Sequence, residues 1–141
     1  MLSVPPLLNE LIGARRWPAT EKDSLSQNLK PLALPERVRR IAQEETSIYL
    51  YAPPFHTVRE HSKTVKSFWN WAKAAPSEID FDLALVIGDF GLGSDAEILL
   101  DYRADASNPR VIRLRWPGEG SPNHWVVAAP DFKTFVEILG L

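Results

Sequence analysis

The sequence predicts a single α+β domain, spanning residues 1–141, in which an antiparallel-rich sheet meander is packed by helices. Two observations predict it. The C-terminal half contains four apolar, strand-like runs separated by turn residues, and helical patterns lie before the first run and after the last. A chain of 141 residues buries about two-thirds of the surface that its unfolded form exposes, which is enough for one self-sufficient core.

The first 33 residues are the least regular part of the chain. Residues 4–14 predict a short helix that starts at Pro5 and Pro6, because proline fits the first helical turn. Residues 17–31 are polar and poorly periodic, so we interpret them as a covering loop. Residues 1–33 are therefore expected to contribute one helix and one loop.

The second predicted helix covers residues 34–45, with Pro35 near its first position. One face of this helix carries three arginines beside several glutamates, and we interpret it as a solvated face rather than a basic binding patch. Its apolar face consists of Val38, Ile41 and Ala42.

A strand and a longer helix follow. Residues 47–52 predict a strand, which Pro53 ends. Residues 57–75 predict a helix, because Thr57 and Glu60 form a capping box in which each side chain accepts a hydrogen bond from an otherwise unsatisfied backbone N–H.

The turn between the first two strands of the C-terminal half is rich in glycine. Gly88, Gly91 and Gly93 fall within six positions. Glycine reaches positive φ without steric cost, so we expect at least one of the three to have a positive φ. A phosphate-binding role is not expected, since the third glycine of the dinucleotide fingerprint is missing and a strand follows.

Residues 97–102 and 111–116 are expected to pair as a hairpin. Alternation along both strands predicts an apolar face directed at the core and a charged face opposite it. The apolar face would carry Ile98, Leu100, Ile112 and Leu114. The charged face is either a lattice of weak cross-strand ion pairs or a recognition surface. The candidate partner-binding residues on or beside it are Glu97, Asp101, Arg113, Arg115, Glu119 and His124.

The last strand and the last helix have clear limits. Residues 123–129 predict a strand, and residues 131–139 predict a helix that Gly140 ends. Apolar side chains recur in this helix at helical spacing, so one face should pack on the sheet. They are Phe132, Phe135, Val136 and Leu139.

The composition excludes several classes of protein. The chain has no cysteine, which removes disulfides, thiol catalysis and cysteine-ligated zinc. Its net charge of −2 argues against a nucleic-acid partner. No apolar run is long enough to span a membrane and the N-terminus lacks the features of a secretory signal, so we expect a cytoplasmic protein without a membrane partner.

Motifs of catalysis and metal binding are incomplete. Asp89-Phe90-Gly91 matches the magnesium tripeptide of kinases, but the other kinase motifs are absent. His56 and His61 are five residues apart, a spacing that does not place two ligands on one helical face. We therefore expect no catalytic residue, no cofactor and no metal site, and predict a protein that is not an enzyme.

Four segments resemble the SUKH superfamily, which includes Smi/Knr-type yeast cell-wall regulators and many bacterial immunity proteins. They are residues 88–95, 100–103, 111–116 and 123–126. The resemblance is strong from Leu83 to Leu141; before that, only Leu34-Pro35 followed by a short helix matches. It implies an α+β fold and a function in binding a partner protein.

By this resemblance, the chain is expected to be an immunity protein that neutralises a toxin by occluding it. Occlusion requires no chemistry, and a domain of this size can offer about 800 Å² to a partner. The alternative is a non-enzymatic regulatory or scaffolding domain of the cell-wall-regulator kind. If the charged face is not the binding surface, the next candidate is the helix that carries Trp71 together with the loop around Trp17.

Overall fold

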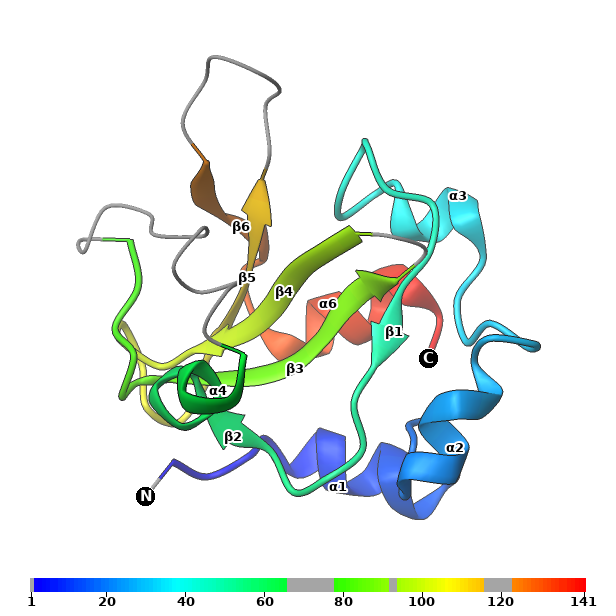
Figure 1. The fold of residues 1–141 in the computed structure, drawn as a ribbon, viewed down its shortest axis with the longest axis horizontal. Helices are drawn as coiled ribbons and strands as arrows, with labels where there is room; N and C mark the ends of the chain where they lie inside the picture. Colours follow the sequence, from blue (N-terminus) through cyan, green and yellow to red (C-terminus); the bar gives the residue numbers. More distant parts are fainter. Residues whose placement is uncertain (1, 66–77, 92–93, 116–122) are drawn as a thin grey trace.

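A six-stranded antiparallel sheet lies at the centre of the structure, a computed structural model that describes residues 2–65, 78–91, 94–115 and 123–141 (Figure 1). Its strand order is β1-β3-β4-β5-β6, and β2 pairs with β3 beside β1. The strands are β1 (Tyr49–Leu50), β2 (His56–Thr57), β3 (Ala84–Gly91), β4 (Ser94–Asp101), β5 (Arg110–Arg115) and β6 (His124–Ala129). The predicted α+β meander is therefore confirmed.

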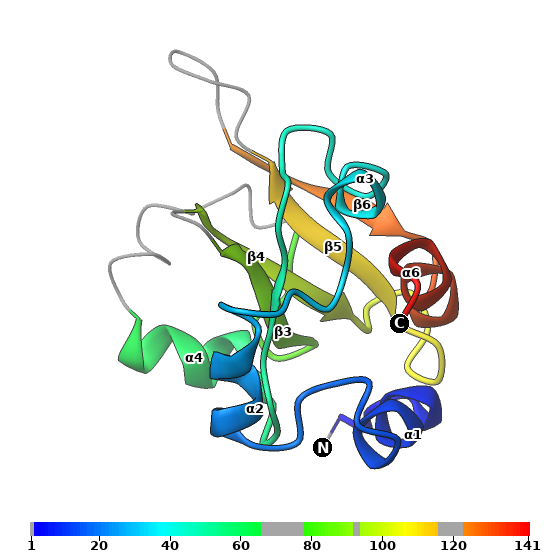
Figure 2. The same ribbon diagram turned by 90° about the vertical axis from the view of Figure 1, so that its right-hand side faces the viewer.

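Helices cover both faces of the sheet, as Figure 2 shows. One face packs against α1 (Pro6–Gly13), α3 (Pro35–Val38) and α6 (Phe132–Leu139), and its core includes Leu8, Val38, Ile98, Leu100, Val111 and Phe135. The other face packs against α4 (Val58–Thr64), and its core includes Val58, Val86, Leu99, Ile112, Leu114 and Trp125. Among the described helices, none is long and apolar enough to cross a membrane.

The last helix begins and ends where the sequence predicts. The Asp131 side chain accepts a hydrogen bond from the Thr134 N–H (2.8 Å) and caps α6. Gly140 follows the helix with a φ of 74°, the left-handed conformation that favours glycine. The four predicted apolar residues of α6 are all buried.

Of the three glycines in the predicted turn, Gly91 has a φ of 59°, which confirms the expectation of a positive φ. Gly93 lies outside the described residues. Gly88 lies within β3, where its Cα is paired with Leu50 of β1. The close packing of β1 on β3 is therefore what requires a residue without a side chain at position 88.

The interpretation of residues 17–31 as a loop is wrong, because they contain α2 (Glu21–Ser26). The Thr20 hydroxyl accepts a hydrogen bond from the Asp23 N–H, while the Asp23 carboxylate accepts one from the Thr20 N–H. This capping box has Asp in place of the usual Glu, so it is a weaker signal in the sequence. Tertiary contacts then hold the segment: Gln27, just after α2, both donates to and accepts from the backbone of Leu50.

Two predicted elements are shorter than expected. The helix predicted over 34–45 is α-helical only from Pro35 to Val38, and turns follow. Glu44, in the turns that follow α3, pairs with Arg113 of β5. The strand predicted over 47–52 is reduced to Tyr49–Leu50.

The predicted capping box of α4 is confirmed. The Thr57 hydroxyl accepts from the Glu60 N–H, and the Glu60 carboxylate accepts from the Thr57 N–H. The described part of this helix ends at Thr64. The rest of the predicted helix, with Trp71, falls in residues 66–77, which lie outside the described residues.

Candidate functional site

The pairing of β4 with β5 contradicts the predicted division of charged and apolar side chains between the two faces. Ile98 pairs with Arg113, and Leu99 pairs with Ile112. Side chains of paired residues lie on the same face of a sheet, so Arg113 shares a face with Ile98. The prediction placed these two residues on opposite faces. It was wrong by one residue of register, which is enough to exchange the two faces of a strand.

The predicted charged face is also not exposed. Glu97 is 4% exposed, Asp101 1% and Arg113 7%. Both faces of the sheet are covered by helices or connecting segments, so the buried charges of β4 and β5 require partners inside the protein. In the described structure these three residues do not form a docking surface, and the prediction that they do is corrected.

Glu97 belongs to a buried polar cluster between the sheet and α4. The hydroxyl oxygen of Tyr51 lies 2.7 Å from Asp89 Oδ2 and 3.0 Å from Glu97 Oε2. Burial and the two neighbouring carboxylates raise the pKa of Tyr51, so its hydroxyl remains a hydrogen-bond donor rather than a base. His61 Nε2 is 3.9 Å from Glu97 Oε1. Burial, together with the nearby His56, lowers the pKa of His61. This cluster ties Tyr51, β3, β4 and α4 together.

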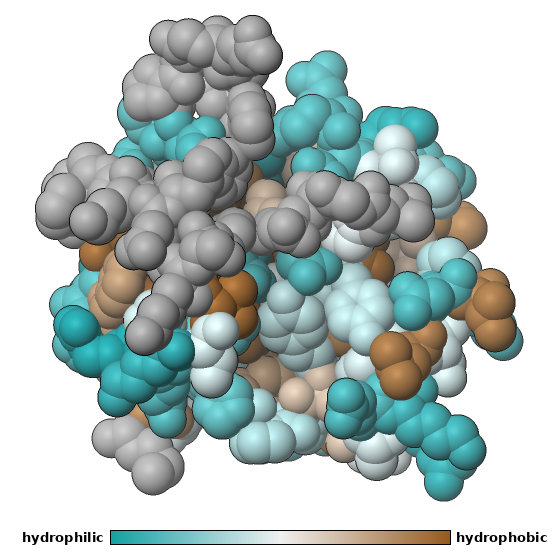
Figure 3. Space-filling view, viewed as in Figure 1, coloured by the Kyte–Doolittle hydropathy of each residue, from teal (hydrophilic) through white to brown (hydrophobic). Residues whose placement is uncertain are grey.

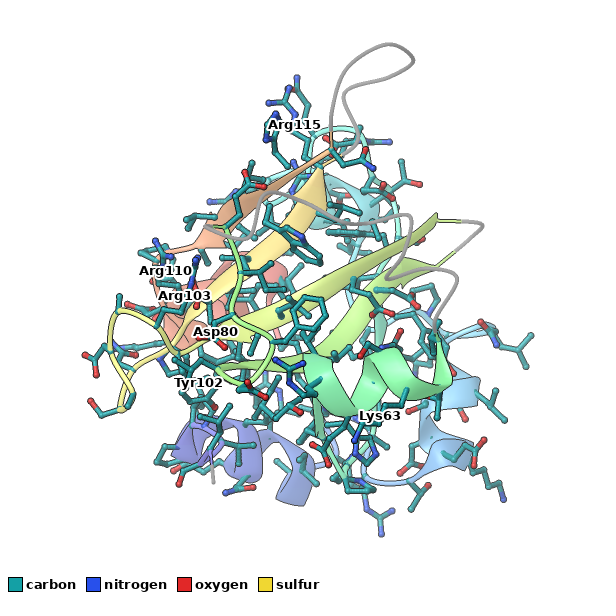
Figure 4. All side chains as sticks on the ribbon, turned by 60° about the vertical axis from the view of Figure 1, so that its left-hand side comes forward. Lys63, Asp80, Tyr102, Arg103, Arg110 and Arg115 are labelled. Carbon is teal, nitrogen blue, oxygen red and sulfur yellow. The ribbon has the colours of Figure 1, made fainter. Side chains whose placement is uncertain are left out.

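Asp101 is the centre of a second buried cluster, at the end of β4. Its carboxylate accepts hydrogen bonds from Arg103 Nε (3.0 Å) and Arg110 Nη2 (2.7 Å). Figure 4 shows Arg103 and Arg110 close together at this end of the hairpin, with Arg115 at the far end of β5. Burial by itself raises the pKa of Asp101, but the hydrogen bonds from the two arginines outweigh it and hold that pKa below its ordinary value. Asp101 is therefore structural.

Arg113 binds Glu44, which comes from the connection between α3 and β1. The ion pair joins the two carboxylate oxygens to the two terminal nitrogens of the guanidinium. Burial raises the pKa of Glu44, but the hydrogen bond from Arg113 outweighs it and leaves the pKa below its ordinary value. The Arg113–Glu44 pair thus anchors a connecting segment to the sheet.

The remaining three candidates are Arg115, Glu119 and His124. Arg115 and His124 are exposed and are paired across β5 and β6. His124 Nδ1 lies 3.1 Å from Glu78 Oε2, and Glu78 Oε1 accepts a hydrogen bond from the Trp125 N–H (3.4 Å). Glu119 lies outside the described residues. Of the five candidates that the structure describes, it brings two together at the surface, Arg115 and His124.

A different part of the surface carries three large apolar side chains that are more than half exposed: Leu25, Leu29 and Leu34, which we call the exposed leucines. They are 56%, 93% and 58% exposed, respectively. Leu25 and Leu29 are four residues apart, and the Lys30 N–H donates to Ser26 O, so the helical turn continues beyond α2 and places both on one side. Figure 3 shows hydrophobic side chains at the right of the molecule, over α2 and the segment that leads to α3.

A groove of about 760 Å³ lies beside α2. Its walls come from the end of α1 and the segment that follows it, and from α2 with the segment after it. Trp17 lines the groove but is only 1% exposed, because its ring packs on Phe132 and its Nε1–H donates to Tyr51 O (2.9 Å). The lining includes Ile12, Arg15, Trp17, Thr20, Asp23, Lys30 and Leu32.

The exposed leucines were not proposed from the sequence as a site. The sequence does contain one signal for them, since Leu25 and Leu29 stand at helical spacing among polar residues. Without the structure, the same two leucines are equally consistent with a helix that buries them. The alternative surface predicted from the sequence combined the helix that carries Trp71 with the loop around Trp17. The part around Trp17 lines the groove, and Trp71 lies outside the described residues.

Within residues 2–65, 78–91, 94–115 and 123–141, no group of three metal-ligating side chains is close enough to hold a metal ion. The groove contains one carboxylate, Asp23, which is engaged by the N–H groups of Ala19 and Thr20. This part of the surface therefore combines exposed leucines with a groove whose lining is both charged and apolar.

No protein-family model, no curated protein sequence and no solved structure matches this chain. The class that the structure defines is an α+β domain with an antiparallel meander sheet. Membership of the SUKH superfamily stays a prediction.

The free energy of unfolding is expected to decrease as the pH falls below about 4. Asp101 and Glu44 have pKa values below their ordinary ones in the folded state, so folding favours their ionised forms. This contribution is fully present above the ordinary pKa values and is lost as the pH falls through the lowered ones. Urea unfolding at neutral and acidic pH measures it. A Glu44→Gln variant should lose less stability on acidification than the unaltered protein; an identical pH profile would contradict the role of Glu44.

Proposed function

We propose that this chain is a protein-binding domain of SUKH type, and that it acts as a cytoplasmic immunity protein that neutralises a toxin by occluding it. The observation that carries the protein-binding role is the exposure of Leu25, Leu29 and Leu34 within ten residues of one another. Exposed apolar side chains in such density mark interaction sites more often than ordinary surface. The SUKH resemblance of residues 83–141 supports the immunity role.

Burial of the exposed leucines by a partner would supply the binding free energy. Full burial of one leucine side chain contributes about 1.5 to 3 kcal/mol. Leu29 is 93% exposed, so almost the whole of this contribution is available on binding. Inhibition by occlusion needs no catalytic group from this chain, which agrees with the structural roles of its buried carboxylates.

Replacement of Leu29 by aspartate is expected to weaken partner binding at least tenfold and to leave the melting temperature unchanged. A single leucine contributes about 1.4 kcal/mol or more when it is buried at an interface, and this corresponds to a factor of ten. Because the side chain of Leu29 has almost no contacts within the domain, the change should not affect folding. Titration of the purified partner by calorimetry measures the affinity.

Val127→Asp is the matched control for the Leu29→Asp variant. Val127 is an exposed apolar residue, 51% exposed, and it lies on β6, far from α2 in both ribbon views. This variant should bind the partner with unaltered affinity. Equal loss of binding in both variants, or no loss of binding in either, would contradict the assignment of the surface to the exposed leucines.

The immunity role is tested by the product of the gene adjacent to the one for this chain. Expression of that product alone should stop cell growth, and co-expression of this chain should restore it. Co-expression of the Leu29→Asp variant should restore growth less well. If the neighbouring product is harmless, and a stoichiometric partner captured with this chain is not a toxin, the regulatory or scaffolding function is the better assignment.

A further inference from the structure

The groove beside α2 has walls that are held in place by internal hydrogen bonds. Trp17 is fixed through its Nε1–H to Tyr51 O, and Gln27 bonds the backbone of Leu50 at 2.8 and 2.9 Å. Both residues line the groove and both are buried. A groove with fixed walls loses little conformational entropy when a ligand enters, which favours its use as a binding site.

The charges of this groove have one predominant sign. Arg15 and Lys30 line it, and neither forms an ion pair with any of the described residues. The only carboxylate in the lining, that of Asp23, accepts hydrogen bonds from Ala19 and Thr20 at the start of α2. Two cations are therefore available in the groove, and they complement a ligand with carboxylate groups.

The backbone of Arg15 supports a role for its side chain. Arg15 has a φ of 60° and lies in the turn that ends α1, where the Arg16 N–H donates to Leu11 O. Glycine is the residue usually found in this left-handed position after a helix, because other residues are strained there. The chain has an arginine in that position, and its side chain reaches the groove.

The groove also has apolar side chains in its lining. Ile12 and Leu32 line it, and both are half-buried. Leu25 and Leu29 are not in the lining, because Ser26, Gln27 and Lys30 direct another side of the same helical turns at the groove. A ligand that enters the groove beside α2 would therefore meet two cations and apolar side chains.

On this geometry, we infer that the groove between α1 and α2 binds an acidic segment of the partner protein that also carries apolar side chains. Carboxylates of this segment pair with Arg15 and Lys30, while its apolar side chains pack against Ile12 and Leu32. This inference rests on the proposed protein-binding function and adds the chemistry of the partner.

Selection from a phage-displayed library of random 12-residue peptides tests the inference directly. The unaltered protein is the target, and the Arg15→Glu/Lys30→Glu double variant is the counter-target. The enriched peptides should combine Asp or Glu with Leu, Ile or Phe. Synthetic copies of these peptides should bind to the Arg15→Glu and Lys30→Glu variants with an affinity at least about tenfold lower than to the unaltered protein.

Two further variants separate binding from folding and from net charge. Arg15→Gly keeps the left-handed backbone and removes the guanidinium, so it should melt at the same or a higher temperature and still lose affinity. Arg39→Glu makes the same charge change at an exposed position outside the groove lining and should bind the peptides with unaltered affinity.

Three results would overturn the inference: no enrichment, enrichment of peptides without acidic residues, or peptides whose affinity is unaltered in both groove variants. These results leave the protein-binding function standing if a partner is still captured and is still lost on Leu29→Asp. Failure of the Leu29→Asp test together with failure of the peptide test would remove both.

Discussion

The Asp101→Ala variant is expected to lose about 3 to 4 kcal/mol of its free energy of unfolding. Asp101 is 1% exposed and accepts hydrogen bonds from Arg103 and Arg110. Removal of the carboxylate leaves two guanidinium groups at the end of β4 without their shared counter-charge. Both arginines keep partial contact with water, with side chains 27% and 36% exposed, so we expect the lower part of the range for buried ion pairs.

Asp82→Ala is the control for this prediction, since Asp82 also pairs with an arginine but on the surface. Asp82 Oδ1 lies 2.7 Å from Arg59 Nε, and both side chains are more than half exposed. Water screens this pair, so its loss should leave the melting temperature essentially unchanged. Urea unfolding of the two variants measures the difference. A stable Asp101→Ala protein would show that this carboxylate does not hold the end of the β4–β5 hairpin.

The Gly88→Ala variant is expected to lose about 2 to 4 kcal/mol of its free energy of unfolding. A Cβ atom at position 88 would lie 2.6 Å from the backbone oxygen of Tyr49 and 3.3 Å from the Cα of Leu50. These are backbone atoms of β1, so no side-chain rotation can relieve the contact, and β1 must move away from β3. Leu50 is fully buried, and its displacement would open the core.

Gly13→Ala provides the matched control. Gly13 is the last residue of α1, and a Cβ atom there would meet nothing within 4 Å. Alanine favours the helix over glycine by up to about 1 kcal/mol, so this variant should be as stable as the unaltered protein or more stable. Thermal and urea unfolding compare the two alanine variants; a similar loss in both would show that the effect at position 88 is not steric.

The burial of Asp101 and Arg113 changes which residues a binding experiment should alter. If the charged residues of β4 and β5 formed an exposed recognition surface, reversal of the charge of Asp101 or Arg113 would weaken binding and leave folding intact. Because both residues are buried and paired, such variants should instead unfold the domain. Loss of binding in them would carry no information about the partner, whereas the exposed Leu29, Arg15 and Lys30 can be altered without this complication.

The sequence by itself determined those parts of the structure that follow from neighbouring residues. The capping box of Thr57 and Glu60, the start of α6 at Asp131 and its end at Gly140 each depend on contacts within one or two helical turns. The meander of β3 to β6 follows in the same way from apolar runs separated by turn residues. For the helix ends, local hydrogen bonding leaves one favourable structure; for the strands, the spacing of apolar runs and turns determines their order but not their register.

The tertiary structure decided which side chains are buried and which remain for a partner. In β4, Leu99 lies on one face of the strand and Ile98 and Leu100 lie on the other, so both faces carry apolar side chains. The sequence pattern is therefore consistent with either face being directed at a given core, and a shift of one residue against β5 exchanges the two faces. The free energy that selects the register comes from packing against helices distant in the sequence. The same distant packing buries Trp17 and leaves Leu29 exposed, because burial depends on which segments meet in space and not on the hydrophobicity of a residue alone.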